Sequence, residues 1–393
     1  MTGWPRVVIA GGSIGGLTAA VLLRDLGCEV DVYERSSEAL QSRGAGIVVL
    51  PMTERYLIER GRTGGRVSLS LTYWSYVDAE GNLLEADPDH FRFSSWNTVY
   101  RGLLDSLEED RYHLNEEMIG FDRRADGVTV RLASSQEVGA DLLVCADGLA
   151  STARRLLLPR VEPLYAGYVA WRGTVPERKL SAAARGGLAD SMLYQVLAGG
   201  HILTYAIPGH GGSVEPGDRL INFVWYRNYA EGEAFESVMT DVNGERRATT
   251  VPPGLVRGEH LRELGDATGE LAPTISEVVA RSSDPFVQAI FDLESPRLVF
   301  GRVLLMGDAA FVARPHVAAG TAKAAADAWA LHDALREAMG DVDAALASWE
   351  PRQLALGRAV VEKSRRMGQR SQFEGSMVPG DPAWKFGLFG PGN

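Results

Sequence analysis

A glycine-rich turn near the start of the chain is the sequence feature that most constrains the fold. Residues 7–10 are apolar and predict a buried strand, residues 17–26 have the pattern of a helix, and the turn between them reads GGSIGG. Glycines in such a turn let the backbone approach a pyrophosphate at the positive N-terminal end of the helix. Together with a second strand at 29–33, they predict a βαβ unit that binds a dinucleotide.

The residues expected on the dinucleotide follow from this unit. Glu34 stands at the end of the second strand, 18 residues after Gly16. Its carboxylate there can accept hydrogen bonds from an adenosine ribose and disfavours a 2′-phosphate. Ser13 occupies the position of the middle glycine of GxGxxG. The alternative interpretation is a plain glycine-rich turn that binds no dinucleotide. The expected contacts are Gly11, Gly12, Ser13, Ile14, Gly15, Gly16, Glu34 and Arg35.

Composition narrows the class of protein. The 393 residues allow two or three domains, and an apolar content of 45% is typical of folded proteins. A net charge of −11 disfavours nucleic-acid and anionic membrane partners, and no segment reaches the ~18 uninterrupted apolar residues of a membrane span. Cys28 and Cys145 cannot build a disulfide framework or a cysteine-rich metal site. We therefore expect a cytoplasmic protein without a metal.

Two acidic motifs follow buried strands later in the chain. Asp147 and Gly148 end a strand at 140–146, where Asp147 by itself is more simply a helix cap. Gly307 and Asp308 end a strand at 302–306 and precede a helix from Gly320. A carboxylate at such a strand end can hold a ribose or ribityl hydroxyl, and the helix N-terminus can stabilise an anion.

The remaining pattern predicts antiparallel sheet and two C-terminal helices. Aromatic and β-branched residues alternate over 69–97 and 165–229, whereas alanine-rich helical patterns fill 318–338 and 344–366. The α/β and antiparallel pieces alternate, so the expected fold class is α/β with α+β character. It combines a Rossmann-like domain with an interleaved antiparallel-sheet substrate domain and C-terminal helices. The expected Rossmann-like domain comprises 1–70, 98–164 and 283–340, the sheet domain 71–97 and 165–282, and the C-terminal segment 341–393.

The order of glycine turn, Glu34, Asp147–Gly148 and Gly307–Asp308 resembles that of the group A flavoprotein aromatic hydroxylases, the para-hydroxybenzoate hydroxylase fold. The resemblance implies bound FAD, NADH (with NADPH as the alternative) and O2 as co-substrates, and ring hydroxylation through a flavin C4a-hydroperoxide. YAGYVAWRG (165–173), RPHVAAGTAKA (314–324) and WKFGL (384–388) are similar to the pyridine-hydroxylase branch. That branch implies 2,6-dihydroxypyridine as substrate and 2,3,6-trihydroxypyridine as product, and the resemblance allows a homodimer.

The same resemblance implies further contacts to FAD. Arg43 and Gly44 match the stretch that runs past the flavin, Arg101 an FAD-contacting arginine, and Asp308 the carboxylate on the ribityl-phosphate side. Asp147 is shared between FAD support and use of the nicotinamide cofactor. The loop contributes Ala318, Ala319, Gly320 and Thr321. Relatives often carry His in place of Phe311, and Gly and Asn in place of Ala318 and Ala322, so we expect loop contacts that differ in detail here.

His316 is the expected catalytic base. An imidazole titrates near neutral pH, and a loop anchored by Pro315 should place it against the flavin and a ring hydroxyl; a structural histidine bonded to backbone is the alternative. The expected substrate-binding residues are Tyr194, His201, Tyr205, Trp225, Pro315 and His316, although alternation alone does not say which strand face each occupies. Hydroxylation of another phenol, a nicotinate-like ring or a natural product stays open, as do an FAD-dependent dehydrogenase and a nicotinamide-only Rossmann protein.

Overall fold

A five-stranded parallel sheet forms the core of one half of the molecule. The computed structural model describes residues 3–40, 46–61, 67–88, 90–388 and 390. The sheet has the order β19-β12-β1-β2-β8, and every neighbouring pair is parallel. Its strands are β1 (Arg6–Ala10), β2 (Glu29–Glu34), β8 (Tyr112–Leu114), β12 (Leu142–Cys145) and β19 (Val303–Leu305). Strands buried on both faces explain the nearly continuous apolar runs in the sequence.

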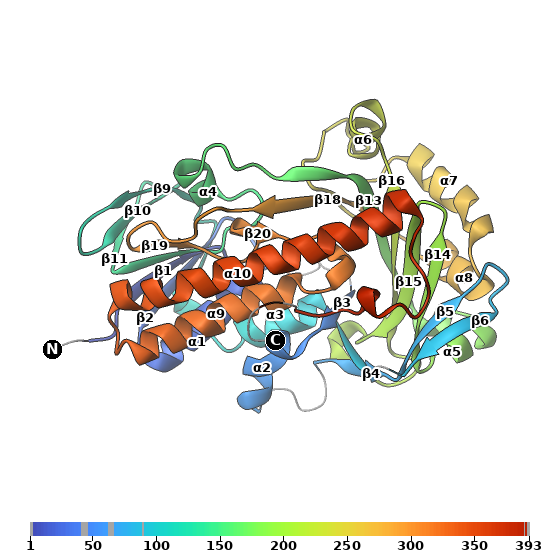
Figure 1. Cartoon of the computed structure of the whole chain (residues 1–393), viewed down its shortest axis with the longest axis horizontal. Helices are drawn as coiled ribbons and strands as arrows, with labels where there is room; N and C mark the ends of the chain where they lie inside the picture. Colours follow the sequence, from blue (N-terminus) through green and yellow to red (C-terminus); the bar gives the residue numbers. More distant parts are fainter. Residues whose placement is uncertain (1–2, 41–45, 62–66, 89, 389, 391–393) are drawn as a thin grey trace.

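Helices and a small sheet cover the two faces of this parallel sheet. The helices α1 (Ile14–Leu26), α9 (Gly320–Glu337) and α10 (Val342–Gln369) lie side by side on one face (Figure 1). A three-stranded antiparallel sheet packs into the same core from the other side. It consists of β9 (Met118–Arg123), β10 (Val128–Leu132) and β11 (Glu137–Ala140). We call this assembly, with α3 (Trp96–Leu104) and α4 (Thr152–Leu157), the parallel-sheet half.

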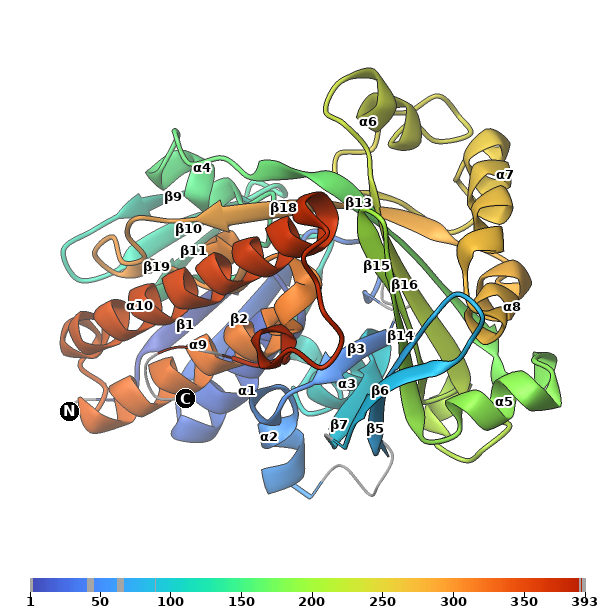
Figure 2. The same ribbon diagram turned by 45° about the vertical axis from the view of Figure 1, so that its right-hand side comes forward.

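A nine-stranded sheet forms the other half, which we call the large-sheet half. Its order is β17-β18-β13-β16-β15-β14-β5-β6, with β20 paired to β18. The strands are β5 (Tyr73–Val77), β6 (Leu83–Asp87), β13 (Leu164–Pro176), β14 (Ser191–Leu197), β15 (Gly200–Ile207), β16 (Leu220–Asn228), β17 (Thr250–Val251), β18 (Phe286–Glu294) and β20 (Phe311–Val312). Helices α5 (Ala182–Leu188), α7 (Gly258–Ala267) and α8 (Pro273–Arg281) cover its outer face, and α6 (Glu233–Val238) lies at one end (Figure 2).

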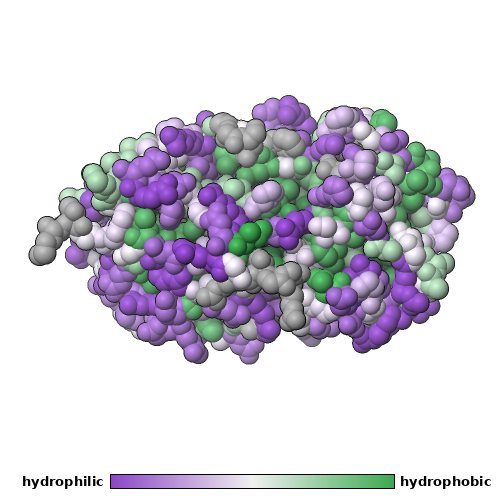
Figure 3. Space-filling view, turned by 90° about the horizontal axis from the view of Figure 1, so that it is seen from below, coloured by the Kyte–Doolittle hydropathy of each residue, from purple (hydrophilic) through white to green (hydrophobic). Residues whose placement is uncertain are grey.

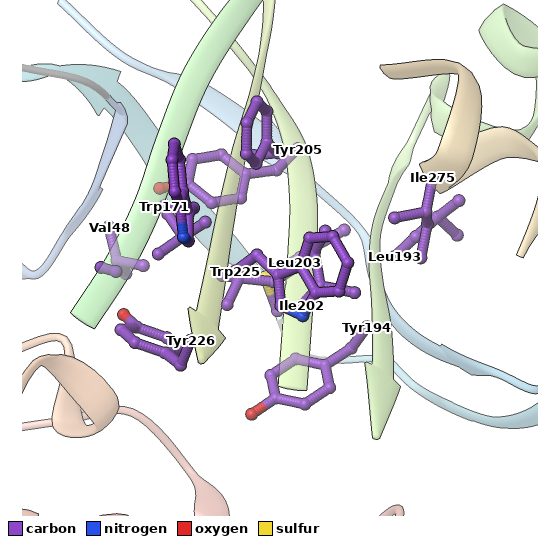
Figure 4. Close-up of a cluster of buried hydrophobic side chains, with 14 of the residues drawn as sticks. Val48, Trp171, Leu193, Tyr194, Ile202, Leu203, Tyr205, Trp225, Tyr226 and Ile275 are labelled. Carbon is purple, nitrogen blue, oxygen red and sulfur yellow. The ribbon is translucent and has the colours of Figure 1, made fainter. Parts of the chain in front are cut away.

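The strand register decides which side chains face the parallel-sheet half. His201 of β15 pairs with Tyr226 of β16, whereas Ile202 pairs with Trp225. Because side chains alternate along a strand, the first pair and the second pair point to opposite faces. Ile275 of α8 packs against the second face, which is therefore the outer one (Figure 4). His201 and Tyr226 consequently lie on the inner face.

A third sheet joins the two halves. Strands β3 (Gly46–Val49), β7 (Phe91–Ser95) and β4 (Leu69–Leu71) pair in the order β3-β7-β4, and α2 (Pro51–Glu59) follows β3. The two-part α/β fold with C-terminal helices is confirmed. The expected boundary at 283, however, would cut β18 from the sheet to which it is hydrogen-bonded. We propose a boundary near residue 295, and the other boundaries stay predictions.

The C-terminal part of the chain spans both halves. Helix α10 runs from the parallel-sheet half to the end of the large sheet, and the chain then returns between the halves (Figures 1 and 2). Hydrophilic residues cover much of the lower face of the molecule, and hydrophobic residues show between them in several separate patches (Figure 3). Among the described residues, no helix has the length and apolarity to cross a membrane.

Candidate active site

The glycine turn is packed too closely for side chains. Gly11 has φ +101°, and a Cβ atom there would lie 2.3 Å from the carbonyl oxygen of Ala146. A Cβ at Gly16 would lie 1.9 Å from the carbonyl oxygen of Gly11, and one at Gly15 would lie 3.0 Å from Cβ of Ala324 on α9. These glycines therefore let β1, β12, α1 and α9 meet closely at the turn, with Ile14 buried as the first residue of α1.

Glu34 braces this turn from the end of β2. Its Oε2 accepts a hydrogen bond of 2.9 Å from the Gly12 amide, and its Oε1 accepts bonds from the amide and hydroxyl of Ser36. The side chain is buried, yet it also forms part of the wall of a cavity at the turn. The carboxylate is thus held in one orientation and keeps lone pairs for a ligand hydroxyl.

That cavity has a volume of about 170 Å³ and lies over the ends of β1, β2 and β12. Its walls are formed by Ala10, Gly11, Ser13, Tyr33, Glu34, Arg35, Glu117, Met118, Ala146, Asp147, Gly148, Ala150 and Thr152. Ser13, the N-cap of α1, makes no side-chain hydrogen bond to the first turn of its own helix. The first amides of α1 are therefore available to bind an anion such as a pyrophosphate.

Asp147 also suits this cavity, and it caps a helix as well. Its Oδ2 accepts hydrogen bonds from the Thr152 and Ala153 amides at the start of α4, 2.8 and 3.2 Å long. Its Oδ1 is buried and has no hydrogen-bond partner among the described residues. Burial raises the pKa of this carboxyl. A polar ligand that reaches Oδ1 would satisfy the atom, so the cavity fits the ADP half of FAD.

Asp308 follows β19 of the parallel sheet. Gly307, with φ +57°, turns the chain after β19, and its amide donates a 2.8 Å hydrogen bond to Asp327 of α9. Asp327 also forms a buried 2.7 Å ion pair with Lys323. Desolvation raises the pKa of Asp308 to about 6, although its side chain is accessible to solvent. The accessible carboxylate could accept a hydrogen bond from a ribityl hydroxyl.

The loop after Asp308 leads into α9. Pro315–Val317 form one short 3₁₀ turn, and Ala318 has φ +52°, the left-handed conformation that favours glycine. Ala319 is buried as the N-cap of α9, Gly320 is exposed, and the hydroxyl of Thr321 lies 3.4 Å from that of Thr53.

The remaining expected cofactor contacts are three arginines and one glycine. Arg43 and Gly44 lie outside the described residues. Arg101 is exposed on α3, and Arg35 is exposed at the rim of the cavity.

His316 is buried against the inner face of the large sheet. Its Nε2 lies 2.7 Å from the Tyr168 hydroxyl, and its ring centroid lies 5.1 Å from that of His201 and 4.9 Å from that of Tyr226. Desolvation, and secondarily the Arg314 cation, lower the pKa of His316 to about 3. Burial and His316 lower the pKa of His201. Both imidazoles are therefore neutral at neutral pH.

The structure places three of the four expected sheet residues on the same face of the large sheet. Tyr194 stacks on His201 with 4.8 Å between ring centroids, and Tyr205 lies on the same face, four residues further along β15. Tyr194 and Tyr226 extend from the strands in the same direction (Figure 4). Trp225 points to the outer face, where it pairs with Trp171, so we remove it from the candidate substrate site. Pro315 only precedes His316 in the short turn.

Sequence reasoning missed four residues of this face. Tyr168 and Tyr226 surround His316, and no local pattern distinguishes them from core aromatics. Arg172 donates to the Gly46 carbonyl oxygen, 2.7 Å away, and Asn222 accepts from the Gly46 amide. Nδ2 of Asn222 is buried without a hydrogen-bond partner among the described residues. Asn222 could have been noticed in the sequence, because it is a polar residue inside an apolar strand.

Among the described residues, no group of three or more His, Cys, Asp and Glu side chains is arranged to hold a metal ion.

Comparison with known proteins places this site in a family. A family model described as FAD binding domain-like matches residues 165–292. The chain is 39% identical over 384 residues to 2,6-dihydroxypyridine 3-monooxygenase of Paenarthrobacter nicotinovorans, covering 98% of this chain and 96% of that protein. It is 28% identical to the FAD-dependent urate hydroxylase of Klebsiella pneumoniae, covering 92% and 89%.

Two solved structures are similar to this one. The structure of 2,6-dihydroxypyridine-3-hydroxylase from Arthrobacter nicotinovorans superposes with a TM-score of 0.92 at 38% identity, covering 98% of both chains. That of Klebsiella pneumoniae HpxO complexed with FAD and uric acid has a TM-score of 0.79 at 24% identity, covering 95% and 90%, and supports the fold alone. The chain belongs to the group A FAD-dependent aromatic hydroxylases, which are flavin monooxygenases.

Proposed function

We propose that this chain hydroxylates 2,6-dihydroxypyridine to 2,3,6-trihydroxypyridine, with NADH as reductant and O2 as oxidant. The observation that carries the proposal is the 39% identity to a 2,6-dihydroxypyridine 3-monooxygenase over 98% of the chain. The buried inner face of phenols and imidazoles supports it, because a small ring with oxygen substituents needs hydrogen-bonding groups in an apolar enclosure. A cytoplasmic location and a homodimer stay predictions.

The residues that would hold FAD fall into three sets. The amides of residues 13–16 would take the pyrophosphate, since those of Gly11 and Gly12 are bonded within the protein. Glu34 and Asp147 would take the adenosine side, and Asp308 with the loop before α9 the ribityl side. FAD, when bound and reduced by NADH, activates O2 and supplies the oxygen atom that enters the ring. What the chain itself adds is binding, orientation and exclusion of water.

Water exclusion follows from the burial of the inner face. Tyr168, Tyr194, His201, Tyr226 and His316 are each less than 10% exposed. A ring bound among them replaces few waters and meets fixed dipoles. The neighbouring side chains therefore favour transfer of oxygen to the ring over its loss to solvent.

His316 is the residue we propose to contact the reacting ring's oxygen. It is neutral at neutral pH, so one of its ring nitrogens can donate a hydrogen bond and the other can accept one. A pKa of about 3 makes it a weak base. It would accept a ring proton only if the resulting ring anion stayed beside it and raised that pKa.

The test is a substrate panel scored for coupled product. The purified protein is saturated with FAD, and NADH consumed is compared with hydroxylated product for 2,6-dihydroxypyridine, other hydroxypyridines, phenols and urate. We expect the protein to show FAD absorbance and to form close to one molecule of hydroxylated product per NADH with 2,6-dihydroxypyridine. We expect a lower ratio of product to NADH with the other rings. A higher ratio of product to NADH with a phenol or urate would show that this ring, and not 2,6-dihydroxypyridine, is the substrate. NADH oxidation without hydroxylated product from any ring would overturn the proposal.

A further inference from the structure

The pair formed by Tyr168 and His316 has a definite hydrogen-bond direction. The Tyr168 hydroxyl lies 2.7 Å from Nε2 of His316, and both side chains are almost completely buried. Burial raises the pKa of Tyr168, so the phenol keeps its hydrogen at any working pH. One of the two atoms must donate to the other, and the surroundings of the phenol decide which.

Arg314 lies beside the phenol of Tyr168. Its guanidinium carbon lies 5.9 Å from the centroid of the Tyr168 ring, and the cation opposes part of the effect of burial on the phenol's pKa. The guanidinium is itself fixed, because its Nε and Nη2 each lie 2.9 Å from Oδ2 of Asp292. Asp292 is buried and is also paired with Arg365 through Oδ1, 2.7 Å away. Arginine has only donors, so this neighbouring cation favours the phenol oxygen as an acceptor, with the phenol hydrogen turned toward His316.

This direction fixes the tautomer of His316. A neutral imidazole carries one hydrogen, and if Nε2 accepts from Tyr168 the hydrogen must be on Nδ1. Nδ1 is buried and has no hydrogen-bond partner among the described residues. The neighbouring His201 does not use it, since Nδ1 of His201 is paired with the Ser371 hydroxyl at 2.6 Å. An unpaired buried donor is costly and therefore points to an acceptor supplied by a ligand.

We propose that His316 donates a hydrogen bond from Nδ1 to a substrate oxygen that already lacks its proton, and that Tyr168 and Arg314 are positioning residues that fix this tautomer. The substrate class recognised is then a ring bearing an oxyanion or a lactam carbonyl, as a deprotonated dihydroxypyridine or its pyridone form presents. No proton passes to His316. The inference rests on the proposed function for the identity of the ring, but the tautomer itself does not depend on it.

The tautomer can be measured in the resting protein. Protein labelled with ¹⁵N-histidine is saturated with FAD, and the His316 nitrogens, identified by their absence in His316→Asn, are classified by NMR as protonated or unprotonated. We expect protonated Nδ1 and unprotonated Nε2, and mixed tautomers in Tyr168→Phe. Tyr165→Phe is the matched control on the same strand, because it removes one phenol hydrogen bond, to the Tyr229 carbonyl, away from His316. Protonated Nε2 in the wild type would overturn the inference.

Substitutions of His316 separate a donor from a base. Asparagine keeps an N–H group at the δ position, glutamine keeps one only at the ε position, and neither can take up a proton. We expect His316→Ala to lower kcat/KM by about 10- to 100-fold, the value of a hydrogen bond to a charged group, and His316→Asn to recover more than half of that loss on a logarithmic scale. Asparagine, glutamine and alanine variants that are equally impaired would contradict the donor role.

The two proposals fail in different ways. If wild-type protein hydroxylates none of the rings but shows the Nδ1–H tautomer, the proposed substrate is wrong and the assignment of His316 stands. If 2,6-dihydroxypyridine is hydroxylated but kcat/KM follows the protonation of an enzyme group that disappears in His316→Asn, His316 is a base and the inference fails. A profile that follows only the substrate's own ionisation in both proteins is the expected result.

Discussion

Gly11 has little freedom to vary, and it lies where the cofactor would come close to the backbone. Two separate effects restrict this position. The backbone has a left-handed φ of +101°, and a Cβ atom added here would lie only 2.3 Å from the carbonyl oxygen of Ala146. Left-handed conformation alone costs a non-glycine residue about 1–2 kcal/mol. A steric conflict with backbone adds to this, because β12 cannot move without disturbing the parallel sheet.

We therefore expect Gly11→Ala to lower the free energy of unfolding by about 2–4 kcal/mol and to abolish stable FAD binding. Urea denaturation and flavin absorbance after gel filtration measure the two effects. Gly139→Ala in β11 is the control, since a Cβ there has open space, and it should change stability by less than about 0.5 kcal/mol. A Gly11→Ala protein with normal stability and FAD content would contradict the account of the turn.

Buried His316 predicts acid sensitivity. The folded-state pKa of about 3 lies below the ordinary value of 6.5, so the unfolded chain binds more protons between these pH values. The stability that this histidine contributes is thus fully present above pH 6.5 and is lost as the pH falls toward 3. From pH 7 to 5 the loss amounts to about 2 kcal/mol. His201 has a pKa lowered in the same direction and adds to the loss.

Urea denaturation at pH 7 and pH 5 measures this dependence. We expect His316→Asn to lose less free energy of unfolding between the two pH values than the wild type does, by about 2 kcal/mol. His210→Asn, at an exposed position, should behave as the wild type. Equal pH dependence in all three proteins would show that His316 is not buried in its neutral form.

Elements differ in how well the sequence predicts them. The βαβ unit at 7–33 could be predicted because its signals are local: an apolar run, glycines at a turn and a carboxylate at a fixed distance. The inner face of the large sheet could not, because alternation along β15 and β16 defines two faces without saying which one is covered by α8. His201 and Trp225 illustrate this, since both sit in similar aromatic stretches and point to opposite sides.

The register of β16 gives a prediction for Trp225. Its side chain is buried on the outer face beside Trp171, away from His201 and His316. We expect Trp225→Phe to lower the free energy of unfolding by about 1–3 kcal/mol through loss of packing, with substrate KM unchanged within about twofold. Urea denaturation and steady-state kinetics on the same preparation provide the comparison. A large rise in KM at unchanged stability would place Trp225 in the substrate site after all.

At the scale of the whole molecule, the candidate site exists only because the two halves meet. His316 comes from the loop before α9, while Tyr168 comes from β13, 148 residues earlier. Such a contact leaves no trace in local sequence, and only the resemblance to a family placed His316 near a substrate. The ion pairs of Asp292 with Arg314 and Arg365 likewise join β18, the loop and α10. None of these could be predicted from spacing.

Bound FAD should stabilise the whole molecule, because its expected contacts come from the glycine turn, β12, β19 and the α9 loop together. Free FAD at 100 times its dissociation constant adds about 2.7 kcal/mol to the free energy of unfolding of a protein that binds it only when folded. Removal of FAD should therefore lower Tm, and its return should restore it in a concentration-dependent way. A Tm that does not respond to FAD would contradict the proposed arrangement of the cofactor.

The most direct test of the central claim is the fate of the oxygen atom. The FAD-loaded protein is given NADH, ¹⁸O2 and 2,6-dihydroxypyridine, and the product is analysed by mass spectrometry together with the NADH consumed. The account predicts 2,3,6-trihydroxypyridine with one ¹⁸O atom, formed in step with NADH oxidation and dependent on FAD. Ring product without ¹⁸O, or NADH oxidation that yields only hydrogen peroxide, would contradict it.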